Sequence, residues 1–223
     1  MQTQTTHIHF LHLPKTGGSA VRNAFKRSGL LSTEHEQRTI SYHPHKKTLA
    51  DIPIGEHIMF TLRDPIDRFV SAFFYCKNTR NQHAFEKFQL KNFATPNDLA
   101  ACLERNNPNH RFALRALKKC LHMRCFRYWY VNKDYFNSRL NDIFFIGFTE
   151  TLDVDFNNLK ALLNVNSNIA LSSEKRLANK GPQQVRYQDK IIQEPGLTLL
   201  KEWYKEDIEF TILCKEIMAS RKR

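Results

Sequence analysis

A glycine-rich loop between an apolar strand and a helix constrains this chain more than any other feature of its sequence. Residues 12–19 read His-Leu-Pro-Lys-Thr-Gly-Gly-Ser, and the apolar run Ile8–Leu13 that leads into them predicts a buried strand. Two adjacent glycines let backbone N–H groups converge on an anion with no Cβ in the way. The helix expected from Ser19 to Gly29 points its positive end at the same loop. The pattern therefore predicts a strand–loop–helix unit that binds phosphate.

The position of the lysine separates this loop from the Walker A loop. In a Walker A loop the lysine follows the last glycine. Here Lys15 precedes both Gly17 and Gly18, and the sequence offers no convincing Walker B aspartate. We therefore expect a phosphate cradle unlike that of a P-loop NTPase. The alternative is a tight strand–helix turn that carries a surface lysine.

A second loop follows another apolar strand, expected at Ile58–Leu62. Arg63 comes directly after this strand, and its guanidinium can hold a phosphate in a bidentate manner. Asp64-Pro65 is typical of a capped helix start. Ser71 lies two turns further on, where its hydroxyl can reach the same anion. The alternative is a surface ion pair of Arg63 with Asp67 beside an ordinary capped helix.

The strands and helices alternate along the chain, which predicts an α/β domain with a mainly parallel sheet. The polar, mixed stretch of residues 30–56 leaves room for a short strand at Thr39–Tyr42. Apolar patterns predict a further strand at Asp142–Phe148 and two long helices, Thr151–Leu163 and Leu197–Ala219. The middle of the chain, about residues 80–140, is expected to be helical, and Thr95-Pro96-Asn97-Asp98 within it is a good helix start. We expect a single domain over residues 1–223. Ligands of such sheets bind at the carboxyl ends of the strands, where both loops fall.

The net charge, the lengths of the apolar stretches and the cysteine count limit which partners and which cellular compartment we expect for this protein. The net charge of +12 requires an anionic ligand, a polyanion or a membrane surface, beyond what a solvated basic surface accounts for. No stretch approaches the roughly 20 apolar residues of a membrane helix, and we see no secretory signal. The five cysteines form an odd, irregular set, so we expect free thiols in a reducing cytoplasm.

No metal site is expected. Cys120 and Cys125 flank His122, but the spacing lacks the matching second pair of a zinc site. The three histidines between residues 7 and 12 have no carboxylate or cysteine near them in sequence, and the last of them falls on the opposite face of the strand.

At its two predicted phosphate loops, the chain resembles the sulfotransferases that use 3′-phosphoadenosine-5′-phosphosulfate (PAPS). The likeness is to the branch of the heparan sulfate 2-O- and 6-O-sulfotransferases and their bacterial relatives. The family's 3′-phosphate motif is similar to Arg63-Asp64-Pro65 followed by Arg68 and Ser71, with weaker likeness at Phe145–Glu150 and Trp203–Asp207. The loop for the 5′-phosphosulfate is similar to the following residues: Pro14, Lys15, Thr16, Gly17, Gly18, Ser19 and Ala20. The likeness covers about residues 7–215 and implies a P-loop-like three-layer α/β/α domain with a helical insertion.

The resemblance implies that a sulfuryl group moves from PAPS to a hydroxyl acceptor and leaves adenosine 3′,5′-bisphosphate, with no metal required. It implies that Lys15 sits on the bridging oxygen and neutralises the charge that develops there. The backbone of residues 16–20 would cradle the 5′-phosphate, and Arg63 and Ser71 would hold the 3′-phosphate. Asn179 and Lys180 are weaker candidates for a late loop that closes over the nucleotide, and an ordinary basic loop is the alternative.

The acceptor hydroxyl needs a base, and a His-x-His pair lies between the two loops. The 2-O enzymes carry a similar pair in this interval, and its second histidine matches His45. We expect His45 to be the base, with His43 as the second choice, because imidazole titrates near a pKa of about 6.5. Two surface histidines beside Lys46 and Lys47 are the alternative.

The acceptor itself is not readable from the sequence, and an acidic glycan and a small molecule both stay open. We expect the helical middle region, about residues 80–140, to shape the acceptor cleft. Its basic residues either contact an anionic acceptor or lie on solvated helix faces: Arg111, Arg115, Lys118 and Lys119. Two other functions are the alternatives, a nucleotide kinase with an atypical loop and a basic nucleic-acid-binding protein. Most phenylalanines fall in apolar runs, which disfavours the exposed aromatic stripe of a nucleic-acid binder. The oligomeric state is not encoded in any pattern that we recognise.

Overall fold

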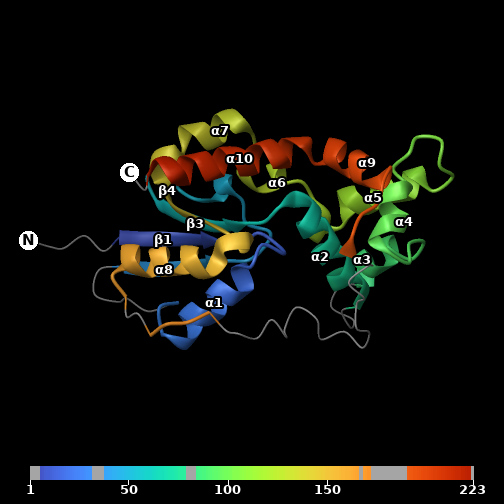
Figure 1. The fold of residues 1–223 in the computed structure, drawn as a ribbon. Helices are drawn as coiled ribbons and strands as arrows, with labels where there is room; N and C mark the ends of the chain where they lie inside the picture. Colours follow the sequence, from blue (N-terminus) through green and yellow to red (C-terminus); the bar gives the residue numbers. More distant parts are fainter. Residues whose placement is uncertain (1–5, 32–37, 79–83, 166–167, 172–189, 222–223) are drawn as a thin grey trace, which may run out of the picture. The chain divides into compact units, whose positions relative to one another are not determined.

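The computed structural model describes residues 6–31, 38–78, 84–165, 168–171 and 190–221 (Figure 1). The chain groups into two compact units. The first unit combines three segments, residues 1–63, 126–173 and 210–223, and the second combines residues 64–125 and 174–209.

The first unit contains a four-stranded sheet in which every neighbouring pair is parallel, with the order β2-β1-β3-β4. Its strands are β1 (Thr6–Leu11), β2 (Arg38–His43), β3 (His57–Leu62) and β4 (Ile143–Phe148). All four strands lie where the sequence predicts them, within one or two residues. The α/β class with a parallel sheet is therefore confirmed.

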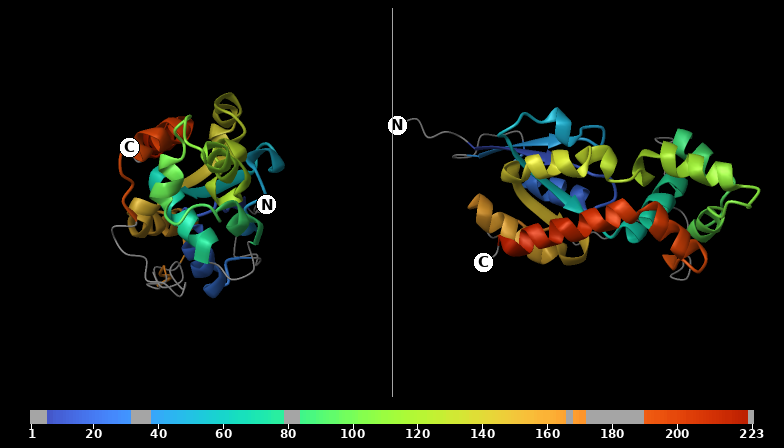
Figure 2. Two further views of the ribbon diagram at one scale, coloured as in Figure 1. Left: turned by 90° about the vertical axis from the view of Figure 1, so that its right-hand side faces the viewer. Right: turned by 90° about the horizontal axis from the view of Figure 1, so that it is seen from above.

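Helices cover both faces of this sheet (Figure 1 and Figure 2). On one face, Phe25 of α1 packs its ring 5.6 Å from the ring of Phe156 on α8. On the other face, Phe136 lies 4.8 Å from Phe210 and 6.4 Å from Phe60 of β3, centroid to centroid. The helices of the unit are α1 (Gly18–Arg27), α6 (Arg127–Tyr130), α7 (Lys133–Ser138), α8 (Leu152–Leu163) and the C-terminal part of α10 (Lys205–Ser220), with the short 3-10 turns η1 (Leu49–Asp51), η3 (Leu140–Asp142) and η4 (Thr149–Thr151).

Arg139 ties the connection between β2 and β3 to this unit. Its side chain is 1% exposed, forms an ion pair with Asp142 and donates to the backbone oxygens of Ile52 and Pro53 at 3.0 and 2.8 Å. The guanidinium thus holds this connection with charge-assisted hydrogen bonds.

The second unit is helical. Its apolar core is built from aromatic and aliphatic side chains that are almost wholly buried, among them Phe69, Phe73, Phe93, Leu99, Leu117 and Leu200. Its elements are α2 (Pro65–Asn78), α3 (Ala84–Gln89), α4 (Pro96–Ala101), α5 (His110–Lys119), η2 (Leu121–Met123), α9 (Gly196–Trp203) and the first residues of α10. The expected starts of α2 and α4 are confirmed, because the side chain of Asp64 caps α2 and that of Thr95 caps α4.

The C-terminal helix predicted over Leu197–Ala219 is wrong in one respect, since the structure has two helices there. The α9 helix ends at Trp203, and α10 begins at Lys205. Between them, the fully buried Tyr204 donates its hydroxyl to the backbone oxygen of Met123 at 2.6 Å. We attribute the break to this tertiary anchor, which the amphipathic pattern alone does not reveal.

Two further expectations concern the whole chain. All five cysteines are free thiols, as predicted. Among the described residues, no helix combines the length and the apolar character that crossing a membrane requires.

Arg68 is the charged anchor of the second unit. It is 0% exposed and donates to the backbone oxygens of Arg124 and His122 at 2.6 and 3.2 Å. It also forms an ion pair at 3.3 Å with Asp207, which is buried to the same degree. Arg68 therefore serves the interior of this unit, although the resemblance places it in the phosphate motif.

We predict that Arg68→Met lowers the free energy of unfolding by about 3–5 kcal/mol, because it leaves the Asp207 carboxylate buried without its partner. Urea unfolding followed by circular dichroism measures this loss. Arg115→Met on the exposed surface of α5 is the matched control and should stay within about 0.5 kcal/mol of wild type. Adding Asp207→Leu to Arg68→Met should recover much of the stability. A full loss in the double variant would contradict the assigned pairing.

Candidate active site

Two loops meet the same edge of the sheet in the first unit. The glycine-rich loop follows β1, and Arg63 follows β3. These strands are parallel neighbours, with Leu11 paired with Phe60 near their carboxyl ends. As the sequence predicts, Lys15 and Arg63 therefore both stand at the carboxyl edge of the sheet, and both side chains are half-buried.

The loop after β1 turns back sharply because of its two glycines. Gly17 has a φ of +86°, and Lys15 also has a positive φ of +64°. Gly18 approaches the ring of His12 so closely that a Cβ would lie 2.3 Å from its Cδ2 atom. Gly17 is thus required by its backbone conformation and Gly18 by packing.

The first turn of α1 suits an anion. Gly17 provides no side-chain cap, and the turn contains no acidic residue. By contrast, the first amides of α2 already donate to the carboxylate of Asp64, at 2.9 and 3.0 Å. Among the described residues, no capping side chain therefore accepts from the first N–H groups of α1, and the positive end of this helix can attract an anionic ligand.

Two threonines hold the glycine-rich loop in place. The buried hydroxyl of Thr16 donates to the backbone oxygen of Leu13 at 2.9 Å and lies 3.0 Å from the hydroxyl of Thr61. The hydroxyl of Thr149 donates to the backbone oxygens of Thr16 and Leu62, at 2.8 and 3.0 Å. Since the Thr16 hydroxyl is used internally, only its backbone N–H is left to face a ligand. The sequence analysis gave Thr149 no role, although its hydroxyl at the end of β4 was a usable signal.

His12 links the loop to β2. Its Nδ1 lies 2.6 Å from the hydroxyl of Tyr42, and its Nε2 lies 3.5 Å from the hydroxyl of Ser19. The guanidinium of Arg22 stacks 4.9 Å above the Tyr42 ring. Burial raises the pKa of Tyr42, so this phenol stays neutral. Sequence reasoning did not assign Tyr42 or Arg22 to the site.

His45 is held in a defined tautomer. Its Nδ1 lies 2.6 Å from the backbone oxygen of His12, and because a carbonyl only accepts, Nδ1 must carry the proton. In the neutral imidazole the lone pair then resides on Nε2. The indole N–H of Trp129 also donates to the backbone oxygen of His45 at 2.7 Å, so both ring and main chain are positioned.

His43 is engaged differently. Its Nε2 lies 2.7 Å from the Nδ1 of His9, and the two rings stack with their centroids 5.0 Å apart. Burial and the nearby Lys47 lower the pKa of His43. Burial, followed by the neighbouring His7, lowers the pKa of His9 to about 4. Both members of the pair are therefore neutral at neutral pH, and one ring N–H donates a hydrogen bond to the unprotonated ring nitrogen of the other.

The remaining predicted residues belong to both units. Pro14 is buried, Ser19 is exposed and Ala20 is half-buried, all within the loop region of the first unit. Ser71 is half-buried on α2 in the second unit. The late loop with Asn179 and Lys180 lies outside the described residues.

A comparison with models of protein families matches residues 1–210 to the sulfotransferase family. The chain belongs to this family. It is therefore assigned as a sulfotransferase, an enzyme that transfers sulfate, and the parallel α/β sheet agrees with that assignment. No curated protein matched the chain in a second comparison.

The close approach of Gly18 to His12 generates a prediction. Gly18→Ala should lower the free energy of unfolding by about 1–3 kcal/mol, because the added methyl group overlaps the imidazole and the loop must shift. Urea denaturation measures this cost. In a His12→Ala background the cost of Gly18→Ala should largely vanish, since the clashing ring is gone. An unchanged cost in that background would place the origin of the effect elsewhere.

Proposed function

We propose that this sulfotransferase takes its sulfuryl group from PAPS, transfers it to a hydroxyl acceptor and releases adenosine 3′,5′-bisphosphate. One observation carries the proposal: a glycine cradle beside an uncapped helix N-terminus lies at the same sheet edge as Arg63. A ligand that bears phosphate groups at two places suits this pair of loops.

The residues of the cradle fit the sulfated end of such a donor. Neither Gly17 nor Gly18 carries a Cβ, so the backbone N–H groups of residues 16–19 can approach oxygens closely, whereas the N–H of Ala20 already donates to the backbone oxygen of Gly17 at 2.9 Å. Lys15 stands at the start of this turn with a full positive charge. We assign it to the bridging oxygen, where it stabilises the negative charge that develops on the leaving phosphate. The donor supplies the sulfuryl group for an in-line displacement.

Arg63 is assigned to the 3′-phosphate. A guanidinium binds phosphate with two parallel hydrogen bonds, which a lysine cannot reproduce. The family resemblance adds Ser71 to the same role and gives Asn179 and Lys180 a part in covering the nucleotide. These three assignments rest on the resemblance, whereas Arg63 is also supported by its place at the end of β3.

His45 is assigned as the base that accepts the proton of the acceptor hydroxyl. The carbonyl of His12 fixes the proton on Nδ1, which leaves the basic lone pair on Nε2. His43 remains the second choice, because its Nε2 is already engaged with His9. We propose carbohydrate hydroxyls as the first acceptors to screen, acidic glycans included, because the chain carries a net charge of +12.

Substitution of the two cationic residues should separate chemistry from donor binding. We predict that Lys15→Ala reduces kcat to background, because charge on the leaving group is no longer neutralised. Arg63→Ala should mainly weaken the binding of adenosine 3′,5′-bisphosphate, by about tenfold to a hundredfold for the loss of a charged hydrogen bond. Isothermal titration and transfer of radiolabelled sulfate from PAPS to a panel of acceptors measure the two effects.

Lys26→Ala is the matched control, because Lys26 is an exposed lysine near the end of α1, away from the loop in sequence. It should bind and turn over like wild type. Wild-type kcat in Lys15→Ala would contradict the assigned role of the lysine. Failure of the wild-type chain to bind adenosine 3′,5′-bisphosphate would contradict the proposed donor.

The two histidines can be distinguished by kinetics. We predict that His45→Ala lowers kcat by about 10²–10⁴-fold, since a general base is lost, while the affinity for adenosine 3′,5′-bisphosphate changes little. His43→Ala should have a clearly smaller effect on kcat. The pH dependence of kcat should lose its ascending limb only in His45→Ala. If His43→Ala loses that limb instead, the base assignment moves to His43.

A further inference from the structure

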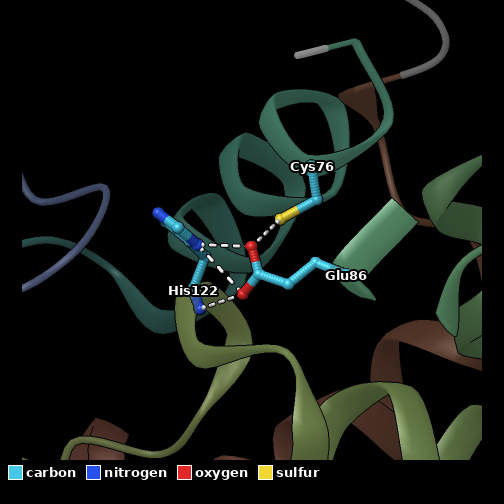
Figure 3. A group of neighbouring side chains, drawn as sticks. All are labelled: Cys76, Glu86 and His122. Carbon is cyan, nitrogen blue, oxygen red and sulfur yellow. Dashed lines mark hydrogen bonds and ion pairs between the residues drawn. The ribbon is translucent and has the colours of Figure 1, made fainter. Parts of the chain in front are cut away.

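A cluster of three metal-binding side chains lies inside the second unit, and the proposed sulfuryl transfer makes no use of it. Cys76 comes from α2, Glu86 from α3 and His122 from η2 (Figure 3). Their exposed fractions are 0%, 5% and 2%. The sulfur, the carboxylate and one ring nitrogen point toward one another in the close-up.

The spacing of the ligand atoms is close to that of a zinc site. The Cys76 thiol donates to Glu86 Oε2 at 3.3 Å, and the same oxygen lies 2.8 Å from Nδ1 of His122. All three ligand atoms lie within 4.8 Å of one another. Tetrahedral zinc with bonds of about 2.0–2.3 Å separates its ligands by about 3.3–3.8 Å. Small side-chain shifts therefore suffice to admit a metal ion.

The kinds of ligand favour zinc over other common ions. A thiolate, an imidazole and a carboxylate are all ordinary zinc ligands, whereas magnesium and calcium prefer oxygen alone. The charges also balance, because a Cys76 thiolate and a Glu86 carboxylate together neutralise a divalent cation beside a neutral His122. A net charge of zero removes most of the cost of burying the individual charges.

The surroundings support the carboxylate and the imidazole. The backbone N–H of His122 donates to Glu86 Oε1 at 3.2 Å, which fixes the orientation of the carboxylate. The ring of Tyr75 packs 4.8 Å from the His122 ring. The Cys120 thiol donates to the backbone oxygen of Glu86 at 3.8 Å. Such outer contacts orient metal ligands in known sites.

We propose that Cys76, Glu86 and His122 bind one Zn²⁺ ion as a structural site in the helical unit. Zinc replaces the thiol proton of Cys76, which goes to solvent, and the Nδ1 proton of His122, which goes to solvent or to Nε2. The fourth position of the tetrahedron falls to a group outside the trio. The ion joins α2, α3 and η2, whose ligands are distant in the chain: Cys76 and Glu86 are 10 positions apart, and Glu86 and His122 are 36 positions apart. Its effect is therefore on the stability of this unit.

This trio is not the set Cys120, His122 and Cys125, whose spacing in the sequence led us to expect no metal site. In the structure, His122 turns to Cys76 and Glu86, which are distant in sequence. Among the described residues, this is the group of three potential ligands that converges in space.

The test uses the full chain after removal of metal by a chelator. Titration with Zn²⁺ against a chromophoric competitor should give one ion per chain, and the melting temperature should rise because the ion binds the folded state. Co²⁺ in place of Zn²⁺ should give the thiolate-to-cobalt charge-transfer absorption of a cysteine ligand. Absence of stoichiometric binding, or of that absorption, would overturn the proposal without any variant.

Variants then identify the ligands. Cys76→Ser should abolish the charge-transfer absorption, and Cys76→Ser and His122→Gln should each weaken zinc binding by at least about a hundredfold, because a ligand is lost. Cys102→Ser is the matched control, since it changes a half-buried cysteine of the same unit outside the trio, and it should keep both affinity and spectrum. Wild-type affinity in Cys76→Ser, or loss of the absorption in Cys102→Ser alone, would overturn the assignment.

Discussion

The parallel pairing of β1 with β3 is the constraint on which the candidate site depends. Parallel neighbours end at one edge, so the loops that follow them are brought together although Lys15 and Arg63 are 48 positions apart in the chain. Thr149 strengthens this arrangement, because one hydroxyl donates to both the glycine-rich loop and the end of β3. The polar edge can then be lined with cations while the strands behind it stay apolar.

Much of the fold is predictable from local sequence pattern. Short apolar runs indicate β1, β3 and β4, while β2 lies in a more polar stretch where only a short strand was expected. Asp64 and Thr95 indicate two helix starts, because capping signals act within a few residues. The break at Tyr204 was missed, since it depends on a hydrogen bond to Met123, which is distant in the chain. The burial of Arg68 was missed for the same reason, as its partners come from two other segments.

In the candidate site, too, some residues are predictable from the sequence, whereas other features require the folded chain. The glycines, Lys15 and Arg63 follow from motif and strand order, whereas the tautomer of His45 follows only from a contact with a backbone oxygen. The inward hydroxyl of Thr16 and the stacking of Arg22 on Tyr42 likewise require the folded chain. The grouping of Cys76 with Glu86 and His122 has no local signature, because each residue comes from a different element.

His12 performs three tasks with three parts of one residue. Its ring packs on Gly18, its Nδ1 meets Tyr42, and its backbone oxygen orients His45. The glycine-rich loop and the histidine proposed as base therefore both contact His12, so a shift of His12 displaces both of them. Under the proposed assignments, a change at His12 would alter both donor binding and proton transfer, so a change of acceptor is easier through residues that do not contact His12.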